Sequence, residues 1–482
     1  MRIWHVLALA VCLRVMLPIS AYFYTRDFTI FYTGDSAQYI VPASQLITHH
    51  RFFSDGSVEA RVWNSPVVPA PDIIRTPGYP LLLVAGLVIG RLALVTIALQ
   101  ILLNSFTVYM VYRTTDLLFE NQHVAIIAAM LYAVEPAGVL FSSLLSTEAM
   151  FSAITAIGLY YLVRYLRQQS LRHLVVSACS LAISAYIRPV GYYLPITIFA
   201  GLGGWMLIKN YQNKAGFSAH LIIFIIVSLA VTGFWRIRNE IVSGYSGFSS
   251  VFSDDMYCNM AASVLATKQH SFYDEIQQRL GCYDLSVYFL DHPAQKTQPI
   301  GQILKHERDE AMTIFLHNPI IFARVYLEGV IRGAFDPLST EFVRLFGFYP
   351  KQGGLLETEV DNGIIKTVKL LLLDRPLALS TAALLAMHLV YILGMCAALI
   401  EGPTSDAAFL TVLVSMSYYL VLPGGPSDWG RYRHPAMPMM CVLSGYGLSA
   451  GWNEISRRVR TAAHTLKLPA SRGMEQSSSV SQ

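Results

Sequence analysis

The stretch Thr33-Gly34-Asp35-Ser36-Ala37-Gln38-Tyr39-Ile40-Val41-Pro42-Ala43 follows the first apolar segment of this 482-residue chain. Asp35, Tyr39 and Ala43 are spaced four residues apart, so a helix here presents them on one face. A second stretch, Arg75-Thr76-Pro77-Gly78-Tyr79-Pro80, leads back into apolar sequence and places a cation near the same boundary. A carboxylate and an arginine at a membrane surface suit a reaction between a lipid-borne phosphate and a polar acceptor.

The composition indicates a polytopic membrane protein. Hydrophobic residues make up 54% of the chain and charged residues 14%, and the mean hydropathy is +0.46. Soluble domains carry about a quarter charged residues. The net charge of +4 is too small to imply a nucleic-acid partner. We therefore expect the basic residues to be sorted by membrane side.

The cysteines do not form a zinc-type pattern, because the sequence has no Cys-x-x-Cys pair and no His/Cys cluster of that kind. Four of the six cysteines lie in apolar segments, where a buried hydrophobic role is the simplest interpretation. Cys258 and Cys282 share one long polar loop. A disulfide between them is possible if that loop faces an oxidising compartment, and two free thiols are the equal alternative.

Apolar segments recur along the whole chain. The predicted spans are Ile3–Phe23, Leu92–Tyr112, Val124–Phe141, Ala149–Leu166, Leu174–Ile187, Gly191–Ile208, Leu221–Trp235, Pro376–Ile400, Ala407–Leu422 and Pro435–Gly451. We interpret the first as a span rather than a signal peptide, because so many others follow. Pro77–Ile89 is shorter than the ~20 residues that a crossing needs. It is therefore an interfacial or re-entrant helix, or the first half of a broken span.

Basic residues assign the two membrane sides. The positive-inside rule places these in the cytoplasm: Arg113, Arg164, Arg167, Arg172, Lys209, Lys214, Arg457, Arg458 and Arg460. The chain then makes roughly ten crossings with both ends inside. The turns that carry chemically interesting residues all emerge on the opposite side.

The predicted fold is an all-α polytopic membrane protein with juxtamembrane helices and one extracytoplasmic loop domain. Residues 1–239 form an N-terminal transmembrane catalytic module, which includes a first extracytoplasmic loop at 25–75. Residues 240–375 form the extracytoplasmic loop domain. The C-terminal transmembrane helices occupy 376–452, and 453–482 form a cytoplasmic tail.

The motifs, in their order, resemble the polyprenyl-phosphate-sugar-dependent membrane glycosyltransferases of the C superfamily, and nearest them the protein O-mannosyltransferase and aminoarabinose transferase group. The resemblance covers most of the membrane part but not the long loop or the tail. It rests on Gly34-Asp35 with Tyr39 and Ala43, Arg75-Thr76-Pro77-Gly78-Tyr79-Pro80, Leu145-Ser146-Thr147-Glu148, Arg188-Pro189, Trp235 with Arg238-Asn239, and Arg431-Tyr432-Arg433 with Pro435 and Pro438.

The chain departs from that family at one position. Many relatives have Asp-Glu where this chain has Asp35-Ser36. Three explanations stay open: the second acid is unnecessary, metal binding is lost, or Glu148 supplies it. A divalent metal held by Asp35 and Glu148 is therefore one alternative, and no other cofactor is expected.

Each candidate residue has a chemical role and a simpler structural one. Asp35 would serve as the general base for the acceptor, or as the N-cap of a helix. Glu148 would bind metal or orient the acceptor, or match a helix dipole. The cationic candidates for the donor phosphate are Arg75, Arg188, Arg238, Arg431 and Arg433, of which we expect at least two only to reach toward headgroups.

Three further residues complete the predicted site. Tyr39 shares the helix face of Asp35, and His434 lies beside the arginines as a metal or phosphate contact. Tyr79 fits an interfacial aromatic belt better than a sugar-stacking role.

These interpretations combine into one functional hypothesis. A glycosyltransferase of this kind moves a sugar from a polyprenyl-phosphate donor (undecaprenyl or dolichyl), which is held in the lipid bilayer, to an acceptor glycan, lipid or protein at the membrane surface. The protein is multi-pass in the plasma (inner) membrane, with its active site on the extracytoplasmic face. One rival is a lipid-sugar flippase or other transporter, although the sequence shows no inverted repeat. The other rival is an assembly subunit whose site has decayed.

Overall fold

The computed structural model describes residues 2–54, 70–209, 214–348, 369, 371–403, 405–422, 425 and 429–466. The described residues are mostly helical, with turns and loops between the helices and one short antiparallel strand pair of β1 (Phe53–Ser54) and β2 (Ala70–Pro71). The predicted all-α class is therefore confirmed. The predictions for the end of the tail, and for parts of the loops at 25–75 and 240–375, fall outside the described residues.

The membrane part begins with ten helices: α1 (Ile3–Thr25), α2 (Ser36–His49), α3 (Gly78–Ile89), α4 (Leu92–Phe119), α5 (Gln122–Ala133), α6 (Pro136–Phe141), α7 (Glu148–Gln168), α8 (Leu171–Ile187), α9 (Leu194–Ile208) and α10 (Lys214–Ser243). The long loop contributes α11 (Val251–Asp254), α12 (Ala262–Gln269), α13 (Tyr273–Arg279), α14 (Leu285–Asp291), α15 (Ile300–His317), α16 (Pro319–Phe335) and α17 (Ser339–Leu345). The chain closes with α20 (Arg375–Glu401), α21 (Ala407–Val421), α22 (Trp429–Arg433) and α23 (Met437–Leu466).

Six helices of the described chain are long and apolar enough to cross a membrane: α1, α4, α7, α9 with its leading turn, α10 and α20. A seventh candidate is the pair α15 and α16, which bends by 105° at its break. The helices α3, α5, α8 and α21 are apolar but shorter. The structure therefore has several spans, and the total of roughly ten stays a prediction.

The predicted span Val124–Phe141 is broken at its middle. Glu135 caps α6 by accepting hydrogen bonds from the backbone N–H groups of Ala137 and Gly138, and Pro136 occupies the first helical position, where its missing N–H costs nothing. The break leaves carbonyl groups near the end of α5 without helical partners. The buried guanidinium of Arg14 in α1 donates to two of them, on Tyr132 and Ala133.

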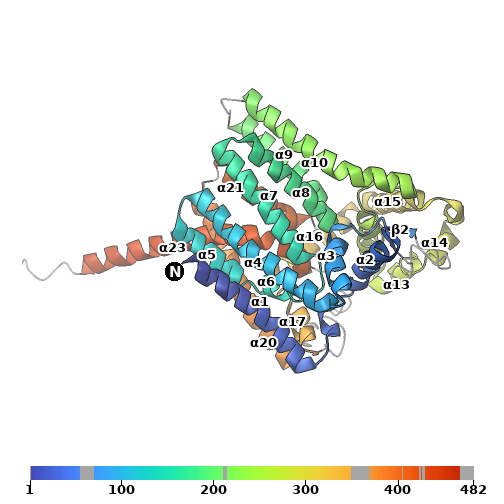
Figure 1. The fold of residues 1–482 in the computed structure, drawn as a ribbon, viewed down its shortest axis with the longest axis horizontal. Coiled ribbons are helices and arrows are strands. Elements are labelled where there is room, and N and C mark those ends of the chain that lie inside the picture. The colour runs from blue at the N-terminus through green and yellow to red at the C-terminus, as the bar shows by residue number, and fades with distance from the viewer. Residues whose placement is uncertain are drawn as a thin grey trace, which may run out of the picture.

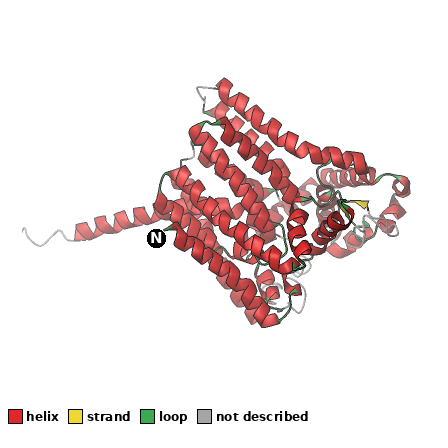
Figure 2. Ribbon diagram, in the orientation of Figure 1, coloured by secondary structure: helices red, strands yellow, loops and turns green. Residues whose placement is uncertain are grey.

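The helices form one bundle, with α7 packed against α4 and α8, and α23 against α5 and α20. Figure 1 shows α2 and the loop helices α13 to α15 at one end of this bundle. The N-terminus and the far end of α23 lie at the opposite end. The strand pair sits among the loop helices, as the strand colour in Figure 2 shows. Polar segments distant in the sequence thus meet at one end.

Candidate active site

Asp35 lies at the start of α2, but its carboxylate does not cap the helix. The residue occupies the N-cap position with no side-chain cap hydrogen bond. Its Oδ1 instead accepts from Arg75 Nη2 at 3.1 Å and its Oδ2 from Arg431 Nη1 at 2.6 Å. The structure thus gives Asp35 two cationic partners in place of the simpler capping role.

The neighbouring Ser36 fixes this acid in place. Its hydroxyl donates to the carbonyl of Leu145 at 2.8 Å and accepts from the backbone N–H of Thr33 at 2.8 Å. The backbone N–H of Leu145 in turn donates to Phe31 at 2.8 Å. These bonds join the turn before α2 to the turn before α7, and so bring Asp35 toward Glu148. A larger acidic side chain at this buried position would break the connection.

Arg75 is held by a turn that the sequence analysis overlooked. Asp72 Oδ1 accepts from the backbone N–H groups of Ile74 at 2.9 Å and Arg75 at 2.8 Å. Burial raises the pKa of Asp72 to about 6, although these hydrogen bonds work in the opposite direction. The Ser249 hydroxyl also donates to the carbonyl of Ile74, at 2.6 Å. The loop domain is therefore attached directly beside the arginine.

Arg431 is positioned by a third segment. Asp336, after α16, accepts from the backbone N–H of Gly430 at 2.7 Å through Oδ2. This bond fixes the start of α22 against the end of α16. The Arg431 guanidinium then reaches both Asp35 and the Oε1 atom of Glu148.

The five groups form one continuous ion-pair network. Its order is Arg75, Asp35, Arg431, Glu148 and Arg188, the last donating to Glu148 Oε1 at 2.8 Å. The Glu148 side chain is 0% exposed, whereas that of Asp35 is 28% exposed. Glu148 therefore pairs with Arg188 and Arg431 from the buried side of the network, whereas Asp35 lies on its solvent-exposed side. Three guanidinium groups against two carboxylates leave one excess positive charge.

The network sets the protonation state of Asp35. Burial opposes ionisation of its carboxyl group, but Arg431 and Arg75 together outweigh that effect and hold its pKa below the ordinary value. Asp35 is therefore ionised throughout the physiological pH range. A carboxylate with so low a pKa is also a weak base until a competing anion draws the arginines away.

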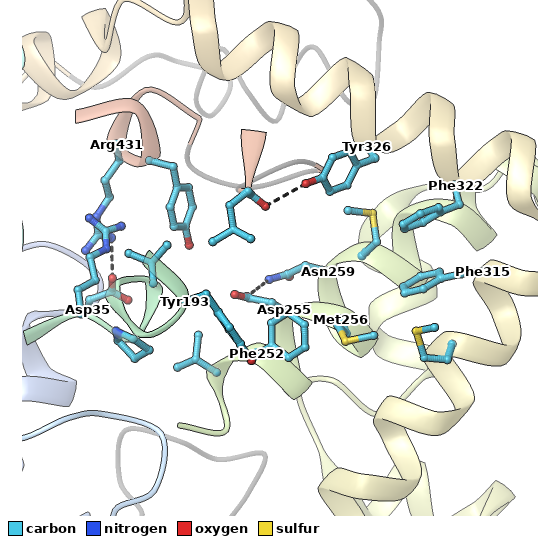
Figure 3. Close-up of a pocket in the computed structure, with 18 of the residues that line it drawn as sticks. Asp35, Tyr193, Phe252, Asp255, Met256, Asn259, Phe315, Phe322, Tyr326 and Arg431 are labelled. Carbon is cyan, nitrogen blue, oxygen red and sulfur yellow. Dashed lines mark hydrogen bonds and ion pairs between the residues drawn. The ribbon is translucent and has the colours of Figure 1, made fainter. Parts of the chain in front are cut away.

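A cavity of about 510 Å³ opens beside the network. Asp35, Arg75, Arg188 and Arg431 line one part of it, together with Tyr39, whose ring lies 5.0 Å from the Arg75 guanidinium carbon. Figure 3 shows the ion pair at one side of this cavity and apolar side chains of the loop helices at the other. The apolar lining includes Met256, Met260, Met312, Phe315, Leu316 and Phe322.

Asp255 is a second acid in the cavity, and sequence reasoning missed it. Its Oδ1 accepts from Asn259 Nδ2 at 2.7 Å, between the polar and apolar parts of the lining (Figure 3). Burial and the neighbouring Asp254 raise the pKa of Asp255 to about 7. An acid inside a Met- and Phe-rich segment was the only sequence feature that marked it.

Four predicted site residues belong to neither the ion-pair network nor the cavity lining. Arg238 donates to the carbonyls of Phe52 and Asp72, and Arg433 donates to those of Gly333 and Asp336. Both guanidinium groups therefore donate to backbone carbonyls and not to groups of the cavity lining.

The other two face the bundle interior. The Tyr79 hydroxyl donates to Gln100 Oε1 at 2.8 Å, and Nδ1 of buried His434 lies 3.7 Å from Glu135. The site as described therefore retains Asp35, Glu148, Arg75, Arg188, Arg431 and Tyr39 from the sequence prediction.

The two acids do not fit a shared divalent metal in this arrangement. Both oxygens of Asp35 and Oε1 of Glu148 accept from guanidinium groups. A cation between the acids would lie against Arg431 and be repelled by it.

Cys258 and Cys282 form a disulfide, with their Cα atoms 5.5 Å apart. It links the segment after α11, which supplies Asp255 and Met256 to the cavity, to the segment between α13 and α14. The loop domain is thus covalently tied at the cavity wall.

The sequence of the chain also matches a known protein family. Residues 75–235 match the dolichyl-phosphate-mannose-protein mannosyltransferase family. The matched segment contains Arg75, Glu148 and Arg188, and lies between Asp35 and Arg431. No curated protein matches the chain in sequence.

Solved oligosaccharyltransferase structures share the fold at low sequence identity. AglB, an oligosaccharyltransferase from Archaeoglobus fulgidus solved with an inhibitory peptide and a dolichol-phosphate, is 13% identical with a TM-score of 0.52, covering 98% of this chain and 52% of that one. An Archaeoglobus fulgidus oligosaccharyltransferase with Zn and sulfate is 14% identical with a TM-score of 0.51, covering 96% and 51%. ArnT from Cupriavidus metallidurans is 11% identical with a TM-score of 0.43, covering 96% and 66%.

The chain spans about half the length of the oligosaccharyltransferases it matches. The family match and the shared fold together confirm the resemblance to the membrane glycosyltransferases of the C superfamily. The chain is a multi-pass membrane protein with that fold, and the family match supports a glycosyltransferase.

Proposed function

We propose that this protein transfers a sugar from a polyprenyl-phosphate donor to an acceptor on the extracytoplasmic face of the membrane, with Asp35 as the general base. The observation that carries the proposal is the juxtaposition of Asp35 and three arginines at one end of a cavity whose other wall is apolar. A lipid-linked sugar phosphate has the same division, an anionic head joined to a long hydrocarbon chain. Undecaprenyl and dolichyl phosphates both fit this description.

The arginines are suited to the leaving phosphate. Arg75, Arg188 and Arg431 are each held by a carboxylate before any ligand arrives, so their positions need little reorganisation. Such preorganised cations lower the barrier as negative charge develops on the departing group. The single excess positive charge of the network attracts the phosphate without a metal ion.

Asp35 becomes a stronger base in the same step. When the donor phosphate takes hydrogen bonds from Arg431 and Arg75, their hold on Asp35 weakens and its pKa rises toward the ordinary range. The carboxylate then accepts the proton of the acceptor hydroxyl or amine as that atom attacks the anomeric carbon. The bond from that carbon to the phosphate oxygen breaks, and the polyprenyl phosphate leaves with the electron pair.

The test is a transfer assay on purified protein. A panel of polyprenyl-phosphate sugars is incubated with candidate acceptors, and products are detected by mass spectrometry. We expect one donor to be consumed, and Asp35→Asn to reduce the rate by about 10²- to 10⁴-fold, the usual contribution of a general base. The matched control, Asp27→Asn, alters an exposed acid after α1 and keeps full activity.

A second variant examines the phosphate clamp. Lysine has no planar fork, so Arg431→Lys cannot bridge Asp35 and Glu148 together. We expect at least a tenfold loss of transfer, while Arg344→Lys in α17 behaves as wild type. Full activity of Asp35→Asn would remove the proposed base, and full activity of Arg431→Lys would remove the proposed clamp.

A further inference from the structure

Outside the cavity, His292, His306 and Glu310 form a cluster in the loop domain. Each offers one ligand atom, and these atoms all lie within 4.8 Å of one another. Nε2 of His292 and Oε2 of Glu310 lie 3.2 Å apart. Two ligands on a tetrahedral zinc ion, with bonds of about 2.0–2.1 Å, stand roughly 3.3 Å apart.

The cluster is assembled from two elements. His306 and Glu310 are four residues apart in α15, so they project from one face of that helix. His292 follows the end of α14, and its ring centroid lies 4.9 Å from that of His306. A metal bound here would therefore clip α14 to α15.

Two contacts prepare these side chains for a cation. Nδ1 of His306 lies 2.8 Å from the hydroxyl of buried Tyr288, so its other ring nitrogen is the one left for a metal. A fixed outer partner of this kind orients metal-binding histidines. Oε2 of Glu310 is a buried atom that accepts no hydrogen bond from the described residues.

We propose that His292, His306 and Glu310 bind one zinc ion. Two imidazoles and one carboxylate suit zinc, and three protein ligands leave a fourth position for water. The next turns of α15 carry Met312 and Phe315, which line the cavity. The ion thus stabilises the wall that faces the donor lipid, and it takes no part in the sugar transfer itself.

The experiment measures zinc in the full-length protein, purified with a tag that contains no histidine. After equilibrium dialysis against micromolar zinc, elemental analysis should give about one ion per chain for wild type. His306→Ala and Glu310→Gln should bind at least tenfold more weakly, and Tyr288→Phe about tenfold more weakly because the outer contact is lost. His317→Ala, an exposed histidine of the same helix, should bind as wild type.

Cobalt provides a measurement that needs no variant to fold. Cobalt added to wild-type protein should give the visible absorption of a tetrahedral site, and zinc should displace it. Wild-type protein that holds no zinc and gives no cobalt spectrum would overturn the proposal. So would His306→Ala and Glu310→Gln variants that retain full zinc content, because the bound ion would then lie elsewhere.

Discussion

Ser36 shows how one small residue can position an acid. Its hydroxyl is shared by the backbone N–H of Thr33 and the carbonyl of Leu145, and the side chain is buried. This chain has serine where many members of the resembled family have a second acid. The serine hydroxyl connects the turn that carries Asp35 to the turn before Glu148. We infer that this connection is what serine contributes at the position where the chain departs from the family it resembles.

The variant Ser36→Ala tests this explanation. It leaves the partly buried N–H of Thr33 and the buried carbonyl of Leu145 without their partner, at a cost of about 1–3 kcal/mol. We expect a lower thermal unfolding temperature and a kcat reduced by about tenfold, with KM for the donor little changed because the arginines stay in place. Unfolding followed by fluorescence and initial transfer rates give both values. The control Ser44→Ala, on the same helix, should change neither one.

Asp255 predicts a pH dependence of stability. Its folded pKa of about 7 lies above the unfolded value of 3.8, so the folded protein retains a proton that the unfolded chain releases between these pH values. The stability that this group contributes is present below pH 3.8 and is lost as the pH rises through 7. The pKa of Asp35 is lowered in the folded protein, so its effect has the opposite sign. The stability that Asp35 contributes is present above the unfolded pKa of 3.8 and is lost only as the pH falls below that value.

Asp255→Asn removes that dependence. We expect the variant to be more stable than wild type at pH 8 by roughly 4 kcal/mol, because the folded pKa of about 7 lies about 3 above the unfolded value of 3.8 and each pKa unit corresponds to about 1.4 kcal/mol. At pH 4.5 the difference should fall to roughly 1 kcal/mol. Thermal unfolding at both pH values measures the difference. Asp291→Asn, an exposed acid of α14, serves as the control. A constant difference between Asp255→Asn and wild type across this range would contradict the assignment.

Charge alone could not show which of the five predicted arginines lie beside the cavity. Three of them form ion pairs with carboxylates beside the cavity: Arg75, Arg188 and Arg431. The other two, Arg238 and Arg433, donate hydrogen bonds to backbone carbonyls. Every residue of the chain carries a carbonyl, so nothing in the sequence marks which ones an arginine will meet. The acids that hold the network in position, Asp72 and Asp336, were missed because their partners are backbone N–H groups.

At the scale of elements, α15 and α16 form the apolar wall of the cavity. Phe315 and Phe322 stack across the bend between them, with ring centroids 4.5 Å apart. We expect Phe322→Ala to raise KM for a long-chain polyprenyl donor about tenfold. Phe322 is partly buried, and a bound chain would cover it further; full burial of a phenylalanine contributes roughly 1.5–3 kcal/mol. KM for a three-isoprene analogue should change less than twofold, because a shorter chain reaches less of the wall. Steady-state kinetics with both donors measures the contrast.

Ile320 provides the control for this chain-length effect. It lies in α16 two residues before Phe322, but its side chain is 83% exposed. Ile320→Ala should leave KM for both donors unchanged. An equal rise in KM for the long and short donors in Phe322→Ala would mean that the wall binds the head of the donor and not its chain.

Hydropathy predicted the helices of the membrane part well, because apolar length is a local property of the sequence. The break within Val124–Phe141 is a local feature too, since Glu135-Pro136 favours the start of a new helix. The side chain that hydrogen-bonds the carbonyl groups at this break could not be predicted. Arg14 satisfies the freed carbonyls from a helix more than 100 residues earlier in the sequence, and only the packing of α1 against α5 brings them together.

At the scale of the whole molecule, the site and the basic helix ends are separated by a membrane thickness. Glu148 begins α7, and Arg167 stands one residue before its end. At 1.5 Å per residue these positions are about 29 Å apart, close to the ~30 Å of a bilayer core. With the proposed orientation, the positive-inside rule predicts that Arg167 lies in the cytoplasm and the ion-pair network on the other face.

Cysteine labelling tests this orientation. In a chain whose free cysteines (Cys12, Cys179, Cys396 and Cys441) are replaced by serine, Lys296→Cys places a thiol on the loop domain and Gln168→Cys places one at the end of α7. A membrane-impermeant maleimide should label the first in intact cells and the second only after permeabilisation. Labelling of both from one side, or the reverse order, would contradict the topology. The ion-pair network lies on the same side of the membrane as the loop domain, because Ser249 of that domain is hydrogen-bonded beside Arg75. The reverse labelling order would therefore place the donor phosphate and its acceptor on the cytoplasmic side.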